Sequence, residues 1–363
     1  MGEPASKLPE TLAQRDLKAR RQEYLWAAPN WSCLTDVLSR HALEDPRDAP
    51  AMWLVLNVAL MVLPAAAWLH AQRSPSHWLG LAYLVLNYAL FLQRFMLTLH
   101  FTEHRKLWRR ALEPLNWLTP YVLAPLYGLP SGAYRLHHCV MHHVEDNAAP
   151  WDLSSTEPYR RDSPLAFARY WLRFALFSSL ELPLYAWRRG RRAWALRAAA
   201  ALGGYWAAVA LLWQRNHVAT LYTLVIPYAL SSLLLMLGNW SQHAFVDPDR
   251  PADDYALTYN CLACPDNART YNDGYHVVHH ANSRLHWSEL PARFLQTLEQ
   301  HDERDALCFQ GIGFLDVGLA VLTGRLGWLA DRVVPCGPKQ AARTRQEWVA
   351  LLQRRLQPVT RAG

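Results

Sequence analysis

Residues 218–238 read VATLYTLVIPYALSSLLLMLG, a run of 21 residues without one charged side chain. An α-helix needs roughly 20 apolar residues to cross the hydrocarbon of a bilayer, so this run is long enough to span a membrane. A helix of the same composition could instead be buried in the core of a soluble protein. The rest of the sequence decides between these two interpretations.

Three further runs have the same apolar character. The four runs form two pairs, because the linkers 71–77 and 214–217 are short. Four apolar runs in close pairs are typical of a membrane protein. We therefore predict an all-α membrane protein with four transmembrane helices in two hairpins. The predicted helices cover about 51–70, 78–99, 194–213 and 218–238.

The basic residues indicate which side of the membrane carries the rest of the chain. Two hairpins place both termini and residues 100–193 on one side, where the basic runs RKLWRR (105–110) and RRGRR (188–192) adjoin helix ends. The linkers on the other side hold one arginine each. Lys and Arg are enriched in cytoplasmic loops, so we predict cytosolic termini. The same bias explains the formal net charge of +7 without a nucleic-acid partner.

Two other apolar segments, 165–187 and 311–334, are interrupted by charges and are predicted to lie in the membrane interface. The first follows Ser163-Pro164, a typical N-cap and first-turn pair. The polar ends, 1–22 and 337–363, are expected to be partly disordered.

Small residues and cysteines give weaker signals. Gly203-Gly204 is expected to let helices pack closely rather than to line a tunnel. The six cysteines form no regular framework, which favours a reducing compartment. We interpret the CLAC pair at 261–264 as structural, because no second CxxC accompanies it.

Ten of the 16 histidines fall in four clusters that this topology brings to the cytosolic side: HFTEH (100–104), LHHCVMHH (136–143), NWSQH (239–243) and HVVHH (276–280). Crowded imidazoles bind few protons, whereas a cation gives them a common ligand. Eight or nine well-placed nitrogens match two metal ions. We interpret His41, His70, His77, His217 and His301, which lie elsewhere, as structural or surface residues.

The clusters and the four helices together resemble the membrane fatty-acid desaturase superfamily, whose members carry histidine boxes of the types HxxxH, HxxHH or HxxxHH, and HxxHH. The resemblance covers roughly residues 50–300. NWSQH and HWSELP (286–291) are similar to stretches of acyl-chain desaturases. The HPGG motif of a fused haem domain is missing from the sequence.

The resemblance implies an integral membrane oxidoreductase that uses a histidine-ligated di-iron centre and O2 to introduce a C=C bond into an acyl-lipid or acyl-CoA. Electrons would come from a separate cytochrome b5 or ferredoxin. The membrane would be the endoplasmic reticulum of a eukaryote or the inner membrane of a bacterium. Residues 51–300 would form the desaturase domain, between a cytosolic segment 1–50 and an interfacial or cytosolic segment 301–363. The expected metal ligands are His100, His104, His138, His142, His143, His243, His276, His279 and His280, with Asn239 as a weaker contributor.

Two alternatives remain at the level of sequence. A hydroxylase or ketolase on the same di-iron scaffold would act on an alkane, sterol, sphingoid base or carotenoid. A non-catalytic membrane protein that binds or carries zinc would place ligands within the bilayer, whereas these clusters lie at its edge. Acidic and amide side chains near the boxes could orient the imidazoles. The candidates for this role are Glu103, Glu145, Asp146, Asp152, Asn272 and Asp273.

The register of LHHCVMHH is ambiguous. On an ideal helix that starts at His138, Cys139 falls at about 100° and His142 at about 40°. Cys139 therefore occupies the place where an HxxHH box has its first histidine. Either a local bulge of one residue lets His138 reach the metal, or Cys139 takes its place. The oxidation risk of a thiolate beside activated oxygen favours His138, and His137 faces away.

Overall fold

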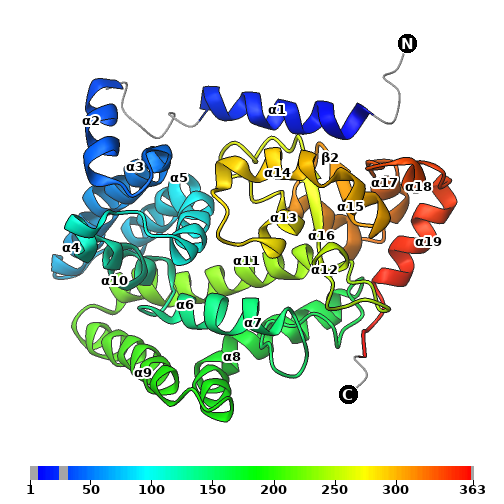
Figure 1. Ribbon diagram of the computed structural model, residues 1–363. Helices are drawn as coiled ribbons and strands as arrows, with labels where there is room; N and C mark the ends of the chain where they lie inside the picture. The colour runs from blue at the N-terminus through cyan, green and yellow to red at the C-terminus, as the bar shows by residue number, and fades with distance from the viewer. Residues whose placement is uncertain (1–6, 24–31, 361–363) are drawn as a thin grey trace. The chain divides into compact units, whose positions relative to one another are not determined.

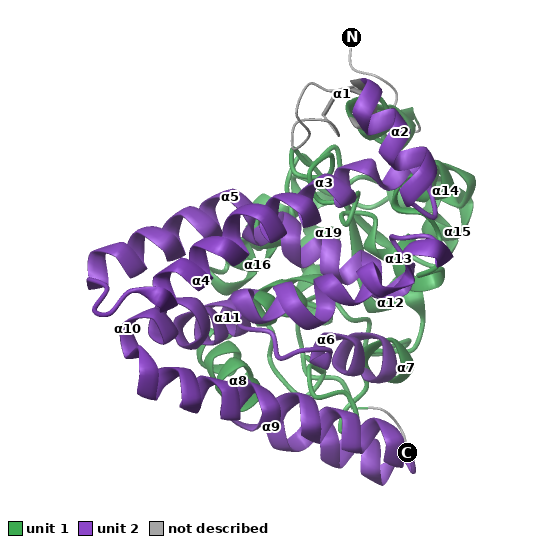
Figure 2. Ribbon diagram, turned by 90° about the vertical axis from the view of Figure 1, so that its left-hand side faces the viewer, with its two compact units in different colours: residues 1–24, 142–174, 235–363 green, residues 25–141, 175–234 purple. Residues whose placement is uncertain are grey.

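The computed structural model describes residues 7–23 and 32–360, most of which are helical (Figure 1). Two compact units make up the chain, and Figure 2 colours them separately. Unit 1 comprises residues 1–24, 142–174 and 235–363, and unit 2 comprises residues 25–141 and 175–234. Unit 1 is thus built from three separate stretches of sequence.

Four helical segments are long and apolar enough to cross a membrane. They coincide with the four predicted runs, and each extends a few residues beyond them. We call them the first to fourth spans. Their bounds are Pro46–Ala71, His77–His104, Arg192–Arg215 and His217–Gln242.

The named elements in the described part of unit 2 are all helices. Its elements include 3₁₀ and π segments, labelled η. In chain order they are α2 (Ser32–Ala42), η2 (Pro46–Asp48), α3 (Ala49–Asn57), η3 (Val58–Val62), α4 (Leu63–Ala71), α5 (His77–His104), η4 (Arg110–Trp117), η5 (Leu118–Leu123), η6 (Ala124–Tyr127), α6 (Ala133–His137), α9 (Arg192–Arg215), α10 (His217–Thr220) and η8 (Leu221–Val225). Three further helices run from one unit into the other: η7 (His138–His142), α8 (Pro164–Arg188) and α11 (Ile226–Gln242).

Proline explains why the first and fourth spans are not uniform α-helices. In each, a π-helical turn, η3 or η8, stands directly before a segment whose second residue is proline, Pro64 or Pro227. Proline lacks the N–H that would bond to the carbonyl four residues earlier, and its ring crowds that carbonyl. The helix accommodates this by widening one turn.

Close helix approach in unit 2 depends on other glycines than the predicted pair. A Cβ on Gly80 would lie 2.2 Å from the ring of Tyr222, and one on Gly128 would lie 2.2 Å from the backbone nitrogen of Tyr228. The prediction for Gly203-Gly204 is wrong, because a Cβ at either position would meet no described atom within 4 Å. Both glycines lie on the exposed face of α9.

The two segments predicted to lie in the interface are helical. The first is α8, and its predicted cap is present, because the backbone N–H of Ala166 donates to Ser163 Oγ at 3.2 Å. The second is divided into α16 (Phe314–Leu322) and α17 (Leu326–Ala330). Gly324 between them adopts a left-handed φ of 70°, which terminates the first of the two helices.

Unit 1 contains the described strands, which the all-helical prediction did not include. Strands β1 (Tyr259–Leu262) and β2 (Leu307–Gln310) pair in parallel, from Tyr259 opposite Leu307 to Leu262 opposite Gln310. The chain between them carries α13 (His276–Ala281), η9 (Trp287–Glu289), α14 (Leu290–Gln296) and α15 (Leu298–Glu303). The last histidine box therefore lies on the crossover between two paired strands. The other elements of unit 1 are α1 (Leu8–Glu23), α7 (His143–Glu145), α12 (Asp254–Leu257), α18 (Pro338–Ala341) and α19 (Arg345–Arg355).

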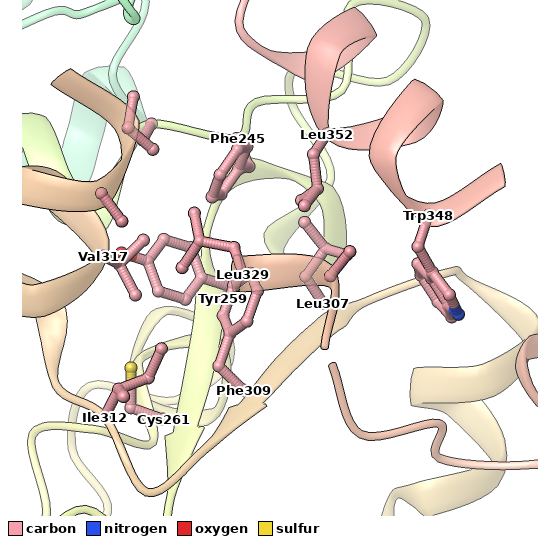
Figure 3. Packing of buried hydrophobic residues seen from close by; sticks show 14 of the residues in the cluster. Phe245, Tyr259, Cys261, Leu307, Phe309, Ile312, Val317, Leu329, Trp348 and Leu352 are labelled. Atoms are coloured by element: carbon pink, nitrogen blue, oxygen red, sulfur yellow. The ribbon is translucent and has the colours of Figure 1, made fainter. Parts of the chain in front are cut away.

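The core of unit 1 forms around these strands (Figure 3). Tyr259 of β1 and Phe309 of β2 are fully buried, with ring centroids 5.2 Å apart. Leu352 of α19 is buried in the same cluster. Full burial of such a side chain contributes about 1.5–3 kcal/mol.

The polar ends are more ordered than predicted. Helix α1 places Asp16, 4% exposed, where it accepts hydrogen bonds from Tyr275 Oη at 2.6 Å and from the N–H of Ala263 at 2.9 Å. At the other end, α18 and α19 are helical, and Trp348 and Leu352 are buried. The expectation of disorder is therefore wrong for residues 7–22 and 337–360, while residues 1–6 and 361–363 lie outside the described part.

Candidate metal centre

The first group of imidazoles belongs to unit 2. His100 and His104 occupy the last turns of α5, one helical turn apart, and His138 begins η7. Ligand nitrogens of these three residues lie within 4.8 Å of one another. His104 Nε2 and His138 Nε2 are 3.0 Å apart, so one of them must be protonated or both must face a shared cation.

Side chains from α5 and α6 hold this group in place. Tyr134 Oη lies 3.3 Å from His100 Nδ1, and its ring stacks on that of His138 with centroids 5.3 Å apart. Arg135 donates to Glu103 Oε2 at 3.2 Å and to the Glu103 carbonyl at 2.9 Å. The i, i+4 spacing could predict the histidine pair, but no sequence signal singles out Tyr134.

The structure favours His138 over Cys139. Residues His138–His142 form a π-helical turn, which is the one-residue bulge that this alternative required. The Cys139 thiol donates to the Glu103 carbonyl at 3.7 Å, and burial raises its pKa to about 12. Neither Cys139 nor His137 belongs to a group of potential ligands among the described residues.

The second group belongs to unit 1. Ligand nitrogens of His142, His243 and His280 lie within 4.8 Å of one another. The ring centroid of His243 lies 5.2 Å from that of His142 and 5.2 Å from that of His280. His142 and His243 are 3% and 0% exposed, so these imidazoles meet in the interior of the unit.

The electrostatics of the second group suit a cation. Burial, reinforced by the neighbouring imidazoles, lowers the pKa of His243 and of His280 well below the usual value. Both rings are therefore neutral. Among the described residues, no hydrogen-bond partner exists for His243 Nε2 or for either ring nitrogen of His280, although all three atoms are buried. Buried lone pairs of this kind match what a transition-metal ion requires.

A carboxylate orients one member of this group. Asp152, 1% exposed, lies with Oδ2 2.7 Å from His142 Nδ1. Its other oxygen accepts from the Ser154 N–H at 2.8 Å and from Ser154 Oγ at 2.6 Å. The contact places the imidazole proton on Nδ1 and turns Nε2 toward the other two rings, as in carboxylate–histidine–metal arrangements. Asp152 is one of the six candidates that the sequence offered for this role. No feature of the sequence predicted the contribution of Ser154.

The crossover segment positions the last box. The Val277 N–H in the first turn of α13 donates to Asn260 Oδ1 of β1 at 3.0 Å. Asn260 Nδ2 in turn donates to His301 Nε2 at 3.0 Å, and His301 Nδ1 bonds to the Thr297 carbonyl at 2.7 Å. Strand β1 and α15 thus fix the helix that carries three of the predicted ligands.

The sequence model of the family described as "Fatty acid desaturase" matches residues 75–311. The chain belongs to the fatty acid desaturase family. The matched region begins just before α5 and ends just after β2, so it contains both groups of imidazoles. No curated protein and no solved structure matches the chain.

Within this family member, the ten predicted ligands are not equivalent in position. Six belong to the two groups described above. His143 and His276 lie beside the second group, with ring centroids 5.1 and 4.9 Å from that of His280. The His279 ring is 5.1 Å from that of His143. Asn239 Nδ2 donates to the Ser154 carbonyl and to Tyr170 Oη, both at 2.8 Å, so its described bonds go to neighbours other than histidine.

Three of the five histidines that were predicted to be structural or surface residues contact other residues. His70 Nε2 lies 3.0 Å from Thr223 Oγ1, and His77 Nδ1 lies 3.4 Å from Tyr222 Oη. His301 is fully buried between Asn260 and Thr297 rather than at the surface.

Proposed function

We propose that this protein is a membrane-bound, O2-dependent desaturase that introduces a C=C bond into the acyl chain of a membrane lipid or an acyl-CoA. The observation that carries the proposal is the group of imidazoles in unit 1, in which His243 Nε2 and both ring nitrogens of His280 are buried without a hydrogen-bond partner among the described residues. Family membership makes iron the metal that best fits them.

In this proposal each group of imidazoles contributes to binding one of two iron ions. His143, His276 and His279 complete the ligand set, with Asn239 as a weaker contributor. When bound, iron supplies the oxidising chemistry for attack on an unactivated methylene, with O2 as oxidant and electrons from a separate cytochrome b5 or ferredoxin. In the overall reaction two hydrogens leave neighbouring carbons. With two electrons and two protons from the donor side, O2 becomes two molecules of water.

The protein's own residues would bind, orient and exclude water. Burial of His142 and His243 keeps bulk water from the ligand nitrogens. Asp152 keeps His142 in one tautomer and one orientation. The spans provide an apolar environment in which an acyl chain can approach the ligands at the ends of α5 and α11. The proposed topology is two hairpins with a cytosolic cap, so that a soluble electron donor reaches the cap.

Expression in a host that lacks the product tests the proposal. Lipids would be profiled by mass spectrometry with localisation of double bonds, and the purified protein would be analysed for metals. We expect the host that expresses the wild type to contain an unsaturated lipid, and the purified wild type to contain iron. His280→Ala should yield no unsaturated lipid and should contain less iron. His217→Ala is the matched control and should resemble the wild type. A hydroxylated or ketolated product would indicate the alternative reaction, and zinc without iron or O2 consumption would contradict an enzyme.

A further inference from the structure

The middle of the second span contains a buried polar side chain. Asn87 of α5 is 4% exposed, and no described residue forms a hydrogen bond with its amide oxygen or its amide nitrogen. An unpaired buried polar group costs about 1–3 kcal/mol. Polar groups in the hydrocarbon are rare, and they often mark the path of a substrate.

The usual structural explanation does not apply to Asn87. Polar side chains in membrane helices often bond to a neighbouring helix. The next residue of α5, Tyr88, does this, because its hydroxyl lies 2.9 Å from Ser231 Oγ and donates to the Pro227 carbonyl at 3.2 Å. Asn87 makes no such bond to the described part of unit 2. Its amide therefore serves another purpose.

Two more polar groups share this property. Tyr83 lies one turn before Asn87 on the same face of α5. Tyr127 is the last residue of η6, and its ring stacks on that of Phe95 with centroids 4.1 Å apart. Both hydroxyls are buried without a hydrogen-bond partner among the described residues. The ring centroid of Tyr127 lies 6.1 Å from that of Tyr88, the residue next to Asn87. We call Tyr83, Asn87 and Tyr127 the midspan cluster.

The chemistry of the midspan cluster defines a ligand class. An amide and two hydroxyls offer both donors and acceptors, and none of the three carries a charge at neutral pH. Such a set fits a neutral oxygen function, a hydroxyl or a carbonyl. A plain methylene chain would leave all three groups unsatisfied.

The position of the cluster relates it to the metal ligands of unit 2. Asn87 precedes His100 by 13 residues on one continuous helix, which corresponds to about 20 Å at 1.5 Å per residue. A lipid chain that lies along α5 with its reacting carbons near His100 would extend to this depth. We propose that the midspan cluster binds a hydroxyl or carbonyl oxygen on the part of the substrate remote from the reacting carbons. This inference rests on the proposed function for the identity of its ligand as the substrate.

Binding measurements test the cluster without requiring turnover. The probes are octadecanoic acid and its ω-hydroxy derivative, titrated into purified, detergent-solubilised protein while the melting temperature is followed. We expect the wild type to bind the ω-hydroxy acid about tenfold more tightly, as one additional hydrogen bond predicts. Asn87→Leu should abolish this preference. Tyr83→Phe, which removes one hydroxyl and keeps the ring, should reduce it and serves if Asn87→Leu does not fold.

Tyr88→Phe is the matched control, because its hydroxyl joins two helices and lies outside the midspan cluster. We expect it to lower the melting temperature and to keep the preference. Equal binding of both acids by the wild type, or a preference that persists in Asn87→Leu, would overturn the inference and leave the amide as a group hydrated by water. If the preference is present but the iron-loaded wild type converts no lipid, the proposed function fails and the cluster stands.

Discussion

At the scale of single residues, the histidines themselves were predictable and their partners were not. Spacing along a helix identifies His100 with His104, since i, i+4 places them on one face. The bond between Asp152 and His142 depends on a loop that folds back over ten residues, which no periodicity encodes. The register of His138 depends on a π-helical turn. Residues 138–142 contain no proline, so the sequence gives no local indication of that turn.

Asp152→Asn should weaken metal binding and keep the fold. The amide oxygen can still accept from His142 Nδ1, but the negative charge that supports a bound cation is lost. We expect metal affinity to fall by about 10–100-fold. Competition with a chelator, followed by elemental analysis, measures the change. Asp162→Asn, an acidic residue whose carboxylate pairs with Arg160, should leave affinity within about twofold of the wild type, and equal affinities for both variants would contradict the role of Asp152.

His301 should make stability depend on pH. Burial lowers its folded-state pKa to about 4, whereas the unfolded chain has the ordinary value of 6.5. Its full contribution is therefore present above pH 6.5 and is lost as the pH falls toward 4, because only the unfolded chain then takes up the proton. The loss amounts to about 3 kcal/mol.

Melting temperatures of the wild type and His301→Gln at pH 7 and pH 4.5 check this expectation. The variant should be less stable at pH 7 and should lose less on acidification. The comparison between the two proteins cancels the effect of other histidines. A decrease of the same size in both would show that His301 does not titrate as its burial requires.

At the scale of elements, apolar length predicted the four spans, and proline explains where the first and fourth deviate from regularity. Glycine was less informative. Two adjacent glycines in α9 suggested close packing, yet Gly80 and Gly128, each isolated in sequence, are the positions where helices approach closely. Whether a glycine lies against a neighbour depends on tertiary packing, which a single helix pattern does not contain.

Gly128→Ala should therefore destabilise unit 2 strongly. Its φ of 74° disfavours any side chain, and the added Cβ would lie 2.3 Å from the Pro227 carbonyl carbon. We expect a loss of more than about 2 kcal/mol. Gly204→Ala is the control, since its Cβ would meet open space and alanine favours a helix by up to about 1 kcal/mol. Thermal unfolding in detergent compares the two, and similar melting temperatures would contradict the packing described for Gly128.

At the scale of the whole molecule, the sequence predicted a helical membrane protein but not its division into units. Strands β1 and β2 have four residues each and are separated by 44 residues of chain. Strands that are so short and so far apart in the sequence leave no local pattern. Their pairing is determined only when the core around them forms. The helical order of the polar ends is likewise a result of long-range burial, as for Asp16 and Leu352.

Reporter fusions test the proposed topology. A fluorescent protein fused after residue 363 should be fluorescent, because it folds in the cytosol. Alkaline phosphatase fused at the same place should be inactive, whereas phosphatase inserted after Arg73, between the first two spans, should be active. This pattern follows from the positive charges that flank the spans on the side of the termini. Phosphatase activity at the C-terminus would contradict the cytosolic cap.

The hydrogen bond between Asp16 and Tyr275 joins residues 259 positions apart. On the ribosome, α1 emerges before strand β1 and the last histidine box, whose neighbours Ala263 and Tyr275 bind Asp16. Its binding site is thus completed only after the four spans have been made. Tyr275 directly precedes His276, so docking of the first helix and completion of the last box are coupled events. A nascent chain stalled before residue 275 would expose α1 to proteases and chaperones, whereas the finished protein conceals the buried face of that helix.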